Sequence, residues 1–200
     1  MRKEPKQARS REMVQRIVTA ARLLLVNEGY DRFATNRVAA AAGISPGSLY
    51  QYFPDKQAIL DVVIDQYWED LATQIELSLS DRIDEFSPAN ARAVIDALLT
   101  ALESDPALLR VLLEELPRSR VLVQYRTMQR RIRDLAATLM VLHGQVTDRA
   151  AAQVKAWVMV VAIENLAIHW VLDQTEISRD ELLDEAVALT AAYLDTAPQG

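Results

Sequence analysis

Helical spacing of apolar residues runs through nearly all of this 200-residue sequence. In the first segment, apolar side chains recur three and four residues apart, at Val14, Ile17, Val18, Ala21, Leu24 and Leu25. No alternating run of apolar and polar residues bounded by turn signals occurs, so the pattern favours helices over strands. The sequence therefore predicts an all-α protein.

Two short helices are expected near the N-terminus. Thr35 is placed to cap a helix over about residues 36–42, and Ser45 is placed to cap a second helix that reaches Phe53. Between them lies a tight turn that contains a glycine. This arrangement is typical of a helix-turn-helix, whose second helix enters the DNA major groove, but other pairs of short helices share it.

Further caps divide the rest of the chain into long helices. Asp55 is expected to cap the fourth helix, and Ser178 with Glu181 forms a capping box before the last one. Other starts are indicated at Ser87-Pro88, Asp105-Pro106 and Thr147 or Asp148. About nine helices result. The most apolar of them, over about 149–173, has too short an unbroken apolar run to span a membrane, so we expect a buried helix and no membrane partner.

Charge is distributed unevenly along the chain. Residues 1–56 hold ten Lys or Arg against five acids, a net charge of +5, whereas the whole chain carries −6 and the remainder therefore −11. A basic first quarter suggests contact with a polyanion, although a solvated basic tail would give the same count. Cysteine is absent, and Arg22 interrupts the apolar run near the N-terminus, so neither disulfides nor a secretion signal is expected and the cytoplasm is the expected location.

The segment TNRVAAAAGISPGSLYQYFPDK, residues 35–56, carries a family resemblance. With the preceding IVTAARLLLVNEGYDRFA, it resembles the DNA-binding domain of the TetR family of transcriptional regulators. The shared features are Glu28-Gly29-Tyr30 after an apolar first helix, a threonine before the second, an Ala-Gly-hydrophobic turn, and Leu-Tyr-x-Tyr-Phe followed by a cap and a lysine. The resemblance covers residues 10 to about 60.

This resemblance implies that some residues of the helix-turn-helix contact bases and others contact phosphates. Ser48 and Gln51 can hydrogen-bond base edges, and Gly47 allows close backbone approach. Tyr50, Tyr52 and Lys56 fall where the family contacts phosphates. The full set of expected DNA-binding residues is Thr35, Asn36, Arg37, Ser45, Pro46, Gly47, Ser48, Tyr50, Gln51, Tyr52 and Lys56.

Cations outside this set can add to phosphate attraction. Relatives often have charged side chains where this chain has Ala40 and Ala41, so Arg37 is the sole cation of the second helix. Arg9, Arg11 and Arg16 are expected to attract phosphates as well. The tail from Arg2 to Arg9 either reaches into a minor groove or makes no contact with DNA.

The resemblance also implies a helical body that binds an effector and dimerises. The expected division is a flexible basic tail at 1–9, the helix-turn-helix domain at 10–56, and the effector-binding and dimerisation domain at 57–200. The last two helices are apolar around most of their circumference, so they either lie in a core or pair with a second copy. The resemblance implies the pairing. A twofold dimer places two recognition helices about 34 Å apart, which implies a palindromic operator.

Aromatic, methionine and isolated polar side chains in the body are candidates for an effector pocket that is mostly apolar. Glu164 is a carboxylate within an apolar run, so it lines the pocket, pairs with Arg126 or Arg130, or faces the dimer partner. The candidates are Trp68, Tyr125, Met128, Trp157, Glu164 and His169, with Met159, Asn165 and Trp170 beside them. For the aromatic residues and methionines, plain core packing is the alternative.

These features favour a homodimeric DNA-binding regulator, by resemblance a repressor that a small-molecule effector releases from its operator. The alternative is a helical ligand-binding or protein-interaction module whose N-terminal three helices are structural. His143 and His169 are not spaced as a metal pair, and no glycine-rich phosphate loop or activated nucleophile is found. We therefore expect no metal, no cofactor and no enzymatic activity.

Overall fold

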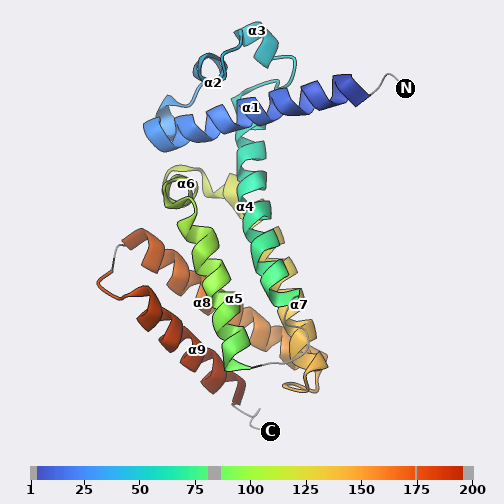
Figure 1. The fold of residues 1–200 in the computed structure, drawn as a ribbon, viewed down its shortest axis with the longest axis vertical. Coiled ribbons are helices and arrows are strands. Elements are labelled where there is room, and N and C mark those ends of the chain that lie inside the picture. The colour runs from blue at the N-terminus through green and yellow to red at the C-terminus, as the bar shows by residue number, and fades with distance from the viewer. Residues whose placement is uncertain (1–3, 81–86, 174, 196–200) are drawn as a thin grey trace. The chain divides into compact units, whose positions relative to one another are not determined.

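A computed structural model of the chain describes residues 4–80, 87–173 and 175–195, and every regular element in these ranges is helical. The elements are α1 (Glu4–Glu28), the 3-10 turn η1 (Tyr30–Arg32), α2 (Thr35–Ala41), α3 (Pro46–Leu49), α4 (Lys56–Ser80), α5 (Pro88–Glu103), α6 (Pro106–Arg110), the π-helical turn η2 (Val111–Glu115), α7 (Arg118–Leu142), α8 (Arg149–Asp173) and α9 (Arg179–Asp195) (Figure 1). The all-α prediction is confirmed.

The chain forms two compact units. The first consists of Met1–Tyr67 and Ala107–Gln124, and the second of Trp68–Pro106 and Tyr125–Gly200. Helices α4 and α7 therefore each contribute residues to both units. The first unit contains the expected helix-turn-helix together with α6, η2 and the start of α7, a segment that sequence order alone assigns to the body.

Side-chain caps begin the helices where the sequence predicts them. Ser45 Oγ accepts a hydrogen bond from the Ser48 N–H at 3.1 Å. Asp55 Oδ1 accepts two from the N–H groups of the first turn of α4, at 2.9 and 2.8 Å. Glu181 N–H donates to Ser178 Oγ at 3.3 Å and the Ser178 N–H donates to Glu181 at 2.8 Å, the reciprocal pattern of a capping box.

Three boundaries in the first unit differ from the sequence predictions. Thr35 is the first residue of α2 and not its cap, because its hydroxyl lies 3.2 Å from the Tyr50 hydroxyl instead of on a backbone N–H. Helix α3 ends at Leu49, before Phe53, whose position ahead of a proline disfavours helix. Helix α1 begins within the segment expected to be a tail, with Pro5 in its first turn, where a proline is tolerated; residues 1–3 lie outside the described ranges.

The three N-terminal helices enclose a small core. Ile17, Val38, Ala39 and Leu49 are fully buried and Phe53 is nearly so. Between α2 and α3 the chain turns at Gly43, whose φ of 65° is a left-handed conformation that glycine adopts without strain. The turn and the core together fix the position of α3.

The segment 107–124 closes on the turn after α1. Glu115 accepts a hydrogen bond from the Tyr30 N–H at 2.8 Å. Gly29 has a φ of 76°, and a Cβ at this position would lie 2.9 Å from the Glu115 Oε2 atom. Arg120 of α7 binds Asp61 of α4 at 3.1 Å. The turn after α1 is therefore shaped by a carboxylate from far along the chain.

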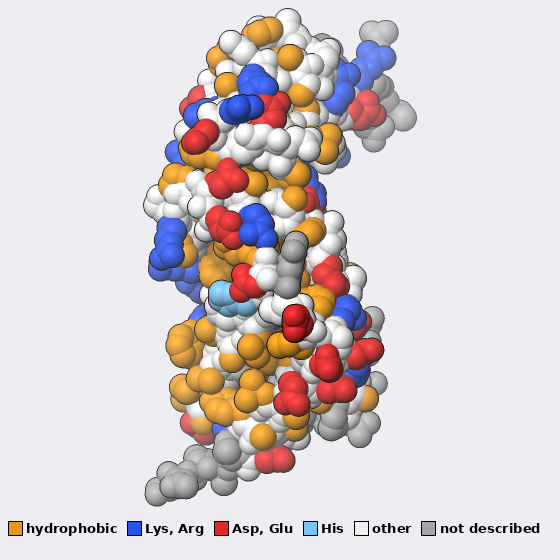
Figure 2. Space-filling view, turned by 90° about the vertical axis from the view of Figure 1, so that its left-hand side faces the viewer, with side chains coloured by type: hydrophobic (Ala, Val, Ile, Leu, Met, Phe, Trp, Pro, Cys, Tyr) orange, Lys and Arg blue, Asp and Glu red, His pale blue; other side chains and the backbone are white. Residues whose placement is uncertain are grey.

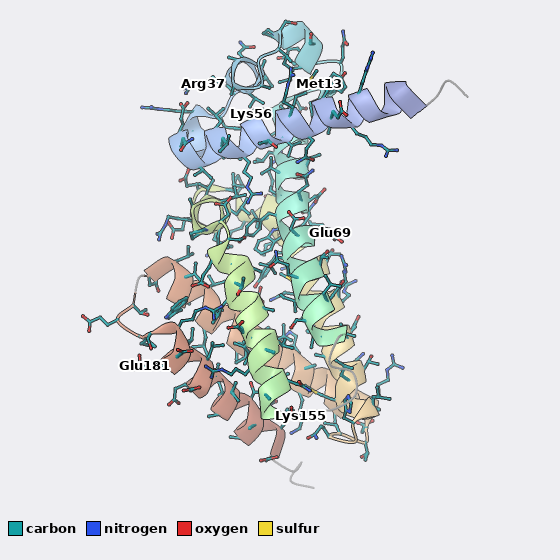
Figure 3. All side chains as sticks on the ribbon, viewed as in Figure 1. Met13, Arg37, Lys56, Glu69, Lys155 and Glu181 are labelled. Atoms are coloured by element: carbon teal, nitrogen blue, oxygen red, sulfur yellow. The ribbon has the colours of Figure 1, made fainter. Side chains whose placement is uncertain are left out.

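In the second unit, α5 packs against both α8 and α9. Arg179 at the start of α9 binds Asp96 and Glu103 of α5, the latter at 3.1 Å. Arg131 of α7 binds Glu69 and Glu76 of α4, the latter at 2.9 Å; Figure 3 labels Glu69. These ion pairs lie at partly exposed positions between neighbouring helices, where each adds little stability on its own.

Helix α8 is buried along one face, whereas the sequence predicts a buried helix. Its buried residues are Ala152, Ala156, Ile163, Glu164, Ala167 and Leu172. By length and composition α8 could cross a membrane, and 28% of that stretch is buried; a single helix of this kind is a weak indication. Apolar side chains also lie on the outer face of α8, where Val154, Trp157 and Leu166 are exposed.

Replacing Leu49 by alanine is expected to destabilise the protein. The side chain is fully buried, and large-to-small substitutions at such positions cost about 2–5 kcal/mol. Urea unfolding followed by circular dichroism measures the loss. The exposed neighbour Gln51→Ala is the control, with an expected change within about 0.5 kcal/mol. Equal losses for the two variants would contradict the anchoring role of Leu49.

Candidate functional site

Helix α3 and the residues after it present an uncharged polar surface. Ser45, Pro46, Gly47 and Gln51 are exposed, and Ser48 is half-buried with its hydroxyl 2.9 Å from that of Ser45. The buried side of the same helix is held by the core. Exposed hydroxyl and amide groups on a short helix can hydrogen-bond base edges in a major groove. The residues that the sequence selects for base contact thus share one accessible surface, which we term the α3 surface (residues 45–48 and 51).

Tyrosines and a lysine flank the α3 surface. Tyr50 is 52% exposed, and its hydroxyl hydrogen-bonds the half-buried Thr35. Lys56 Nζ lies 5.2 Å from the centre of the Tyr30 ring, within the range of a cation–π contact. Tyr52 is half-buried. These groups can donate hydrogen bonds to phosphate oxygens, which position a protein on DNA without reading its sequence.

The cation of α2 has an acidic partner. Arg37 and Asn36 are both exposed, and the guanidinium of Arg37 forms an ion pair with Glu28 at the end of α1 (Figure 3). An ion pair within the protein offsets part of the charge that Arg37 offers to a phosphate. Arg9, Arg11 and Arg16 lie exposed on α1, where they are available for phosphate contacts.

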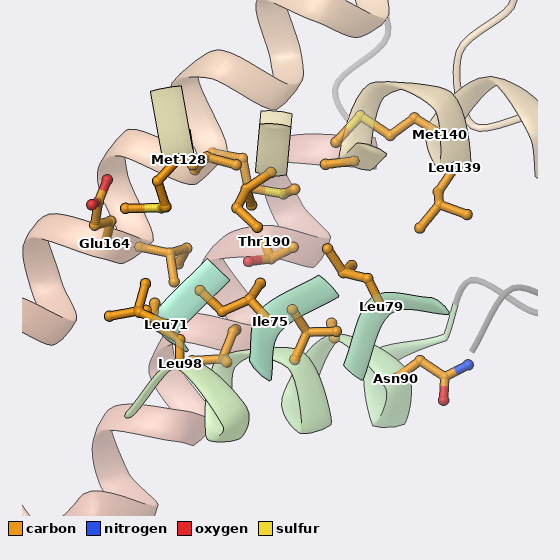
Figure 4. A pocket seen from close by; sticks show the side chains of 18 of the residues that line it. Leu71, Ile75, Leu79, Asn90, Leu98, Met128, Leu139, Met140, Glu164 and Thr190 are labelled. Atoms are coloured by element: carbon orange, nitrogen blue, oxygen red, sulfur yellow. The ribbon is translucent and has the colours of Figure 1, made fainter. Parts of the chain in front are cut away.

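The second unit contains a cavity of about 130 Å³. Nineteen described residues line it: eighteen lie on five helices and His143 lies just after α7, and fifteen of the nineteen are hydrophobic. The four polar lining residues are Asn90, His143, Glu164 and Thr190, and Figure 4 labels all of them except His143. Thr190 donates its hydroxyl hydrogen bond to the backbone of its own helix, at the Ala186 carbonyl, at 2.8 Å. A mostly apolar cavity with few polar groups is typical of a small-molecule site.

Glu164 is buried in the wall of this cavity, with 6% of its surface exposed. Gln129 of α7 donates a hydrogen bond to its carboxylate at 2.6 Å, and Tyr125 is a second hydrogen-bond partner. Burial raises the pKa of the Glu164 carboxyl, partly offset by these two bonds. Burial and the nearby Glu164 charge also raise the pKa of Tyr125. Of the alternatives for Glu164, its location in the wall is observed, with an amide partner in place of Arg126 or Arg130.

The other residues expected in the pocket are divided between the cavity, the core and the surface. Met128 and Met159 line the cavity. Trp68 and Tyr125 do not; they pack against each other beside it, with ring centres 5.2 Å apart. Trp157 is 51% exposed on the outer side of α8.

Three polar candidates on α8 make local hydrogen bonds. The His169 ring lies 2.9 Å from Asp173 on the exposed side of the helix. Asn165 donates to the Val161 carbonyl at 2.7 Å, and the Trp170 ring N–H donates to the Ile177 carbonyl at 2.7 Å. His143, whose spacing from His169 is not that of a metal pair, lines the cavity. Apart from Asn90 and Thr190, the remaining lining residues are apolar and, in sequence, resemble any helical core.

Two family models match the chain and together cover most of both units. The model of "Bacterial regulatory proteins, tetR family" matches residues 17–63. The model of "Tetracyclin repressor-like, C-terminal domain" matches residues 88–194, more than half of the chain.

Individual proteins are similar over different lengths. The nucleoid occlusion factor SlmA of Escherichia coli K12 is 33% identical over 108 residues, and this match spans 54% of the chain and 54% of that relative. A TetR-family transcriptional regulator from Syntrophomonas wolfei has the same fold, with a TM-score of 0.72, 16% identity, and coverage of 95% of this chain and 99% of that one. The multidrug binding protein EbrR, solved in complex with imidazole, aligns with a TM-score of 0.68, 17% identity, and coverage of 93% and 97%.

Replacing Glu164 by glutamine is expected to stabilise the protein at neutral pH. Because burial raises its pKa in the folded state, the carboxyl binds a proton more readily folded than unfolded, and wild-type stability falls as pH rises from about 4.5 through the folded pKa. Glutamine does not ionise and can still accept the Gln129 hydrogen bond. Thermal unfolding at pH 4 and pH 8 should show a higher midpoint for Glu164→Gln at pH 8 and a smaller difference at pH 4.

The exposed Glu176→Gln is the matched control, with a change in stability within about 0.5 kcal/mol expected. A Glu164→Gln protein that is less stable than the wild type at pH 8 would contradict the role of burial.

Proposed function

Since the chain belongs to the TetR family of bacterial regulatory proteins, we propose that it is a homodimeric repressor that a small, largely apolar effector releases from a palindromic operator. The observation that carries this proposal is the α3 surface, which exposes Gln51 and the Ser45–Ser48 turn on a short helix anchored by Leu49. The match to a repressor-like C-terminal domain supports the repressor role. Regulators of this family are DNA-binding proteins and generally not enzymes.

In this proposal, residues 10–56 form the DNA-binding domain and residues 57–200 the domain for effector and dimer. Gln51 and Ser48 hydrogen-bond base edges, with Gly47 allowing the backbone to approach closely. The other expected DNA-binding residues contact the sugar-phosphate backbone and fix the position of the protein along the DNA. They are Thr35, Asn36, Arg37, Ser45, Pro46, Tyr50, Tyr52 and Lys56. Action on DNA places the protein in the cytoplasm.

Exposed apolar side chains on α8 and α9 support the proposed dimer. Val154, Trp157, Leu166 and Leu189 are each at least 43% exposed, and Figure 2 shows hydrophobic side chains gathered on one face of the second unit. A monomer rarely leaves so many large apolar side chains together in water. Pairing of α8 and α9 with a second copy would cover them and would give the twofold symmetry that a palindromic operator matches.

The cavity of the second unit is the proposed effector site. An effector that binds more tightly to a conformation unable to bind the operator shifts the protein toward that conformation. Met128 and Glu164 are the members of the expected pocket set that line the cavity. The other four, Trp68, Tyr125, Trp157 and His169, are not assigned a direct effector contact.

Gel-shift titration on DNA flanking the gene tests the DNA-binding proposal. A saturable complex that weakens with salt is expected, since phosphate contacts release counterions. Gln51→Ala should lose about 1–3 kcal/mol of binding free energy and should no longer discriminate between bases at the position that Gln51 contacts. Lys56→Ala should weaken binding to all DNA sequences, and the slope of log affinity against log salt concentration should decrease by about one.

Glu176→Gln, an exposed change outside the first unit, is the control for both variants. Absence of any saturable complex would overturn the DNA-binding proposal, and identical behaviour of the two variants would overturn the separate roles.

Trp157→Glu or Leu166→Glu is expected to convert the dimer into monomers, because a buried, unpaired carboxylate in an apolar interface is strongly unfavourable. Sedimentation velocity measures the mass in solution. Leu77→Glu is the matched control: Leu77 is 59% exposed, but it lies on α4 outside the proposed interface, so its variant should remain dimeric. A dimer that persists in both α8 variants would place the interface elsewhere.

A further inference from the structure

The cavity of the second unit is long and narrow. Three of its lining residues, Leu71, Ile75 and Leu79, follow one another at four-residue intervals along α4. Eight residues of helix span about 12 Å, so the cavity extends at least over that length. Its volume of about 130 Å³ is thus drawn out along the helix axis, a shape that suits a chain better than a ring.

The two ends of the cavity differ in exposure. At one end Leu71, Leu98 and Met128 are buried, together with Glu164. At the other end, where Figure 4 labels Leu79 and Asn90, both residues are half-buried, and so is His143, three residues after the lining residue Met140. A ligand with one polar group therefore keeps that group hydrated, or hydrogen-bonded by an amide or imidazole, only at the second end.

The chemistry of the wall favours aliphatic ligands. Among the described residues, leucine, isoleucine, valine, alanine and methionine supply all fifteen hydrophobic side chains of the lining, and no Phe, Tyr or Trp is one of them. Stacking on an aromatic ring, which commonly recognises flat ring systems and quaternary ammonium groups, is not offered by this lining. Methionine and branched aliphatic side chains instead pack closely around a methylene chain.

Charge in the wall disfavours ions. Among the described lining residues there is neither Lys nor Arg, so a carboxylate or phosphate group deep in the cavity would have no ammonium or guanidinium partner. The one carboxylate, Glu164, is turned toward Gln129 and Tyr125 on α7, which already hydrogen-bond it. Figure 4 shows its carboxyl group directed away from Leu71 and Leu98. It is not positioned to pair with a ligand cation.

We propose, resting on the effector role given to this cavity above, that the ligand is an uncharged molecule with an unbranched aliphatic chain. The chain lies between α4, α5 and α7 with its free end near Glu164. Its polar group, an alcohol or carbonyl oxygen, lies at the Asn90 and His143 end.

Isothermal titration calorimetry of the full chain with three eight-carbon probes tests this assignment. Octanol, cyclooctanol and octanoate differ in one property each, the shape of the chain or the charge of the head group. Octanol is expected to bind at least tenfold more tightly than either of the others. Binding of cyclooctanol or octanoate as tight as that of octanol, or no binding of octanol, would overturn the proposal.

Two variants locate the bound octanol. Ala91→Leu on α5 and Ala136→Val on α7 add side-chain volume inside the cavity, and each should weaken octanol binding at least tenfold. Ala97→Leu lies on the same helix as Ala91, half-buried and outside the lining set, and should leave the affinity unchanged. Circular dichroism verifies that each variant is folded. Unchanged affinity in both folded cavity variants would place octanol elsewhere and overturn the assignment.

Gel-shift on the same preparations separates the two proposals. Loss of octanol binding in a protein that still binds DNA overturns only the ligand assignment. Absence of DNA binding in a protein that still binds octanol overturns the regulator role and leaves the ligand assignment standing.

Discussion

The position of one four-residue helix depends on two buried side chains. A helix as short as α3 has too few backbone hydrogen bonds to persist in isolation, so tertiary packing must hold it. The buried Leu49 and Phe53 supply that packing, with α3 against α2, and the left-handed Gly43 sets the turn before it. Because these groups face inward, the residues on the α3 surface are free to be small and polar. The orientation of the proposed base-reading groups is thus determined by the core.

Much of the first unit could be predicted because local chemistry fixes it. The caps at Ser45 and Asp55, like that at Ser178 in the second unit, satisfy N–H groups within three residues, so sequence spacing alone reveals them. Thr35 has the same chemistry but finds its partner in Tyr50, fifteen residues away, which no local rule anticipates. The bond from Glu115 to the Tyr30 backbone, across eighty-five residues, is still harder to foresee, since any residue except proline offers an N–H group.

The cavity could be predicted only in part, for a related reason. Aromatic and polar side chains draw attention in a sequence, yet Trp157 and His169 lie on the surface of α8 and Trp68 in the core. The wall consists mainly of aliphatic residues whose spacing is that of any buried helix face, and whether such faces meet or leave space depends on how five helices pack. Glu164 was identifiable because a carboxylate in an apolar run requires an explanation. Its neutral partners explain why it is tolerated.

The distribution of charge separates affinity from sequence preference in the proposed DNA contact. The α3 surface carries no charge, and Arg37 shares its charge with Glu28, so neither provides much attraction to phosphates. The exposed cations of α1 and Lys56 must provide most of it, while the rest of the chain, at −11, repels DNA and favours approach by the basic end. Affinity would then depend steeply on salt, because it arises from phosphate contacts. Preference between sequences would depend on a few neutral hydrogen bonds and would change little with salt.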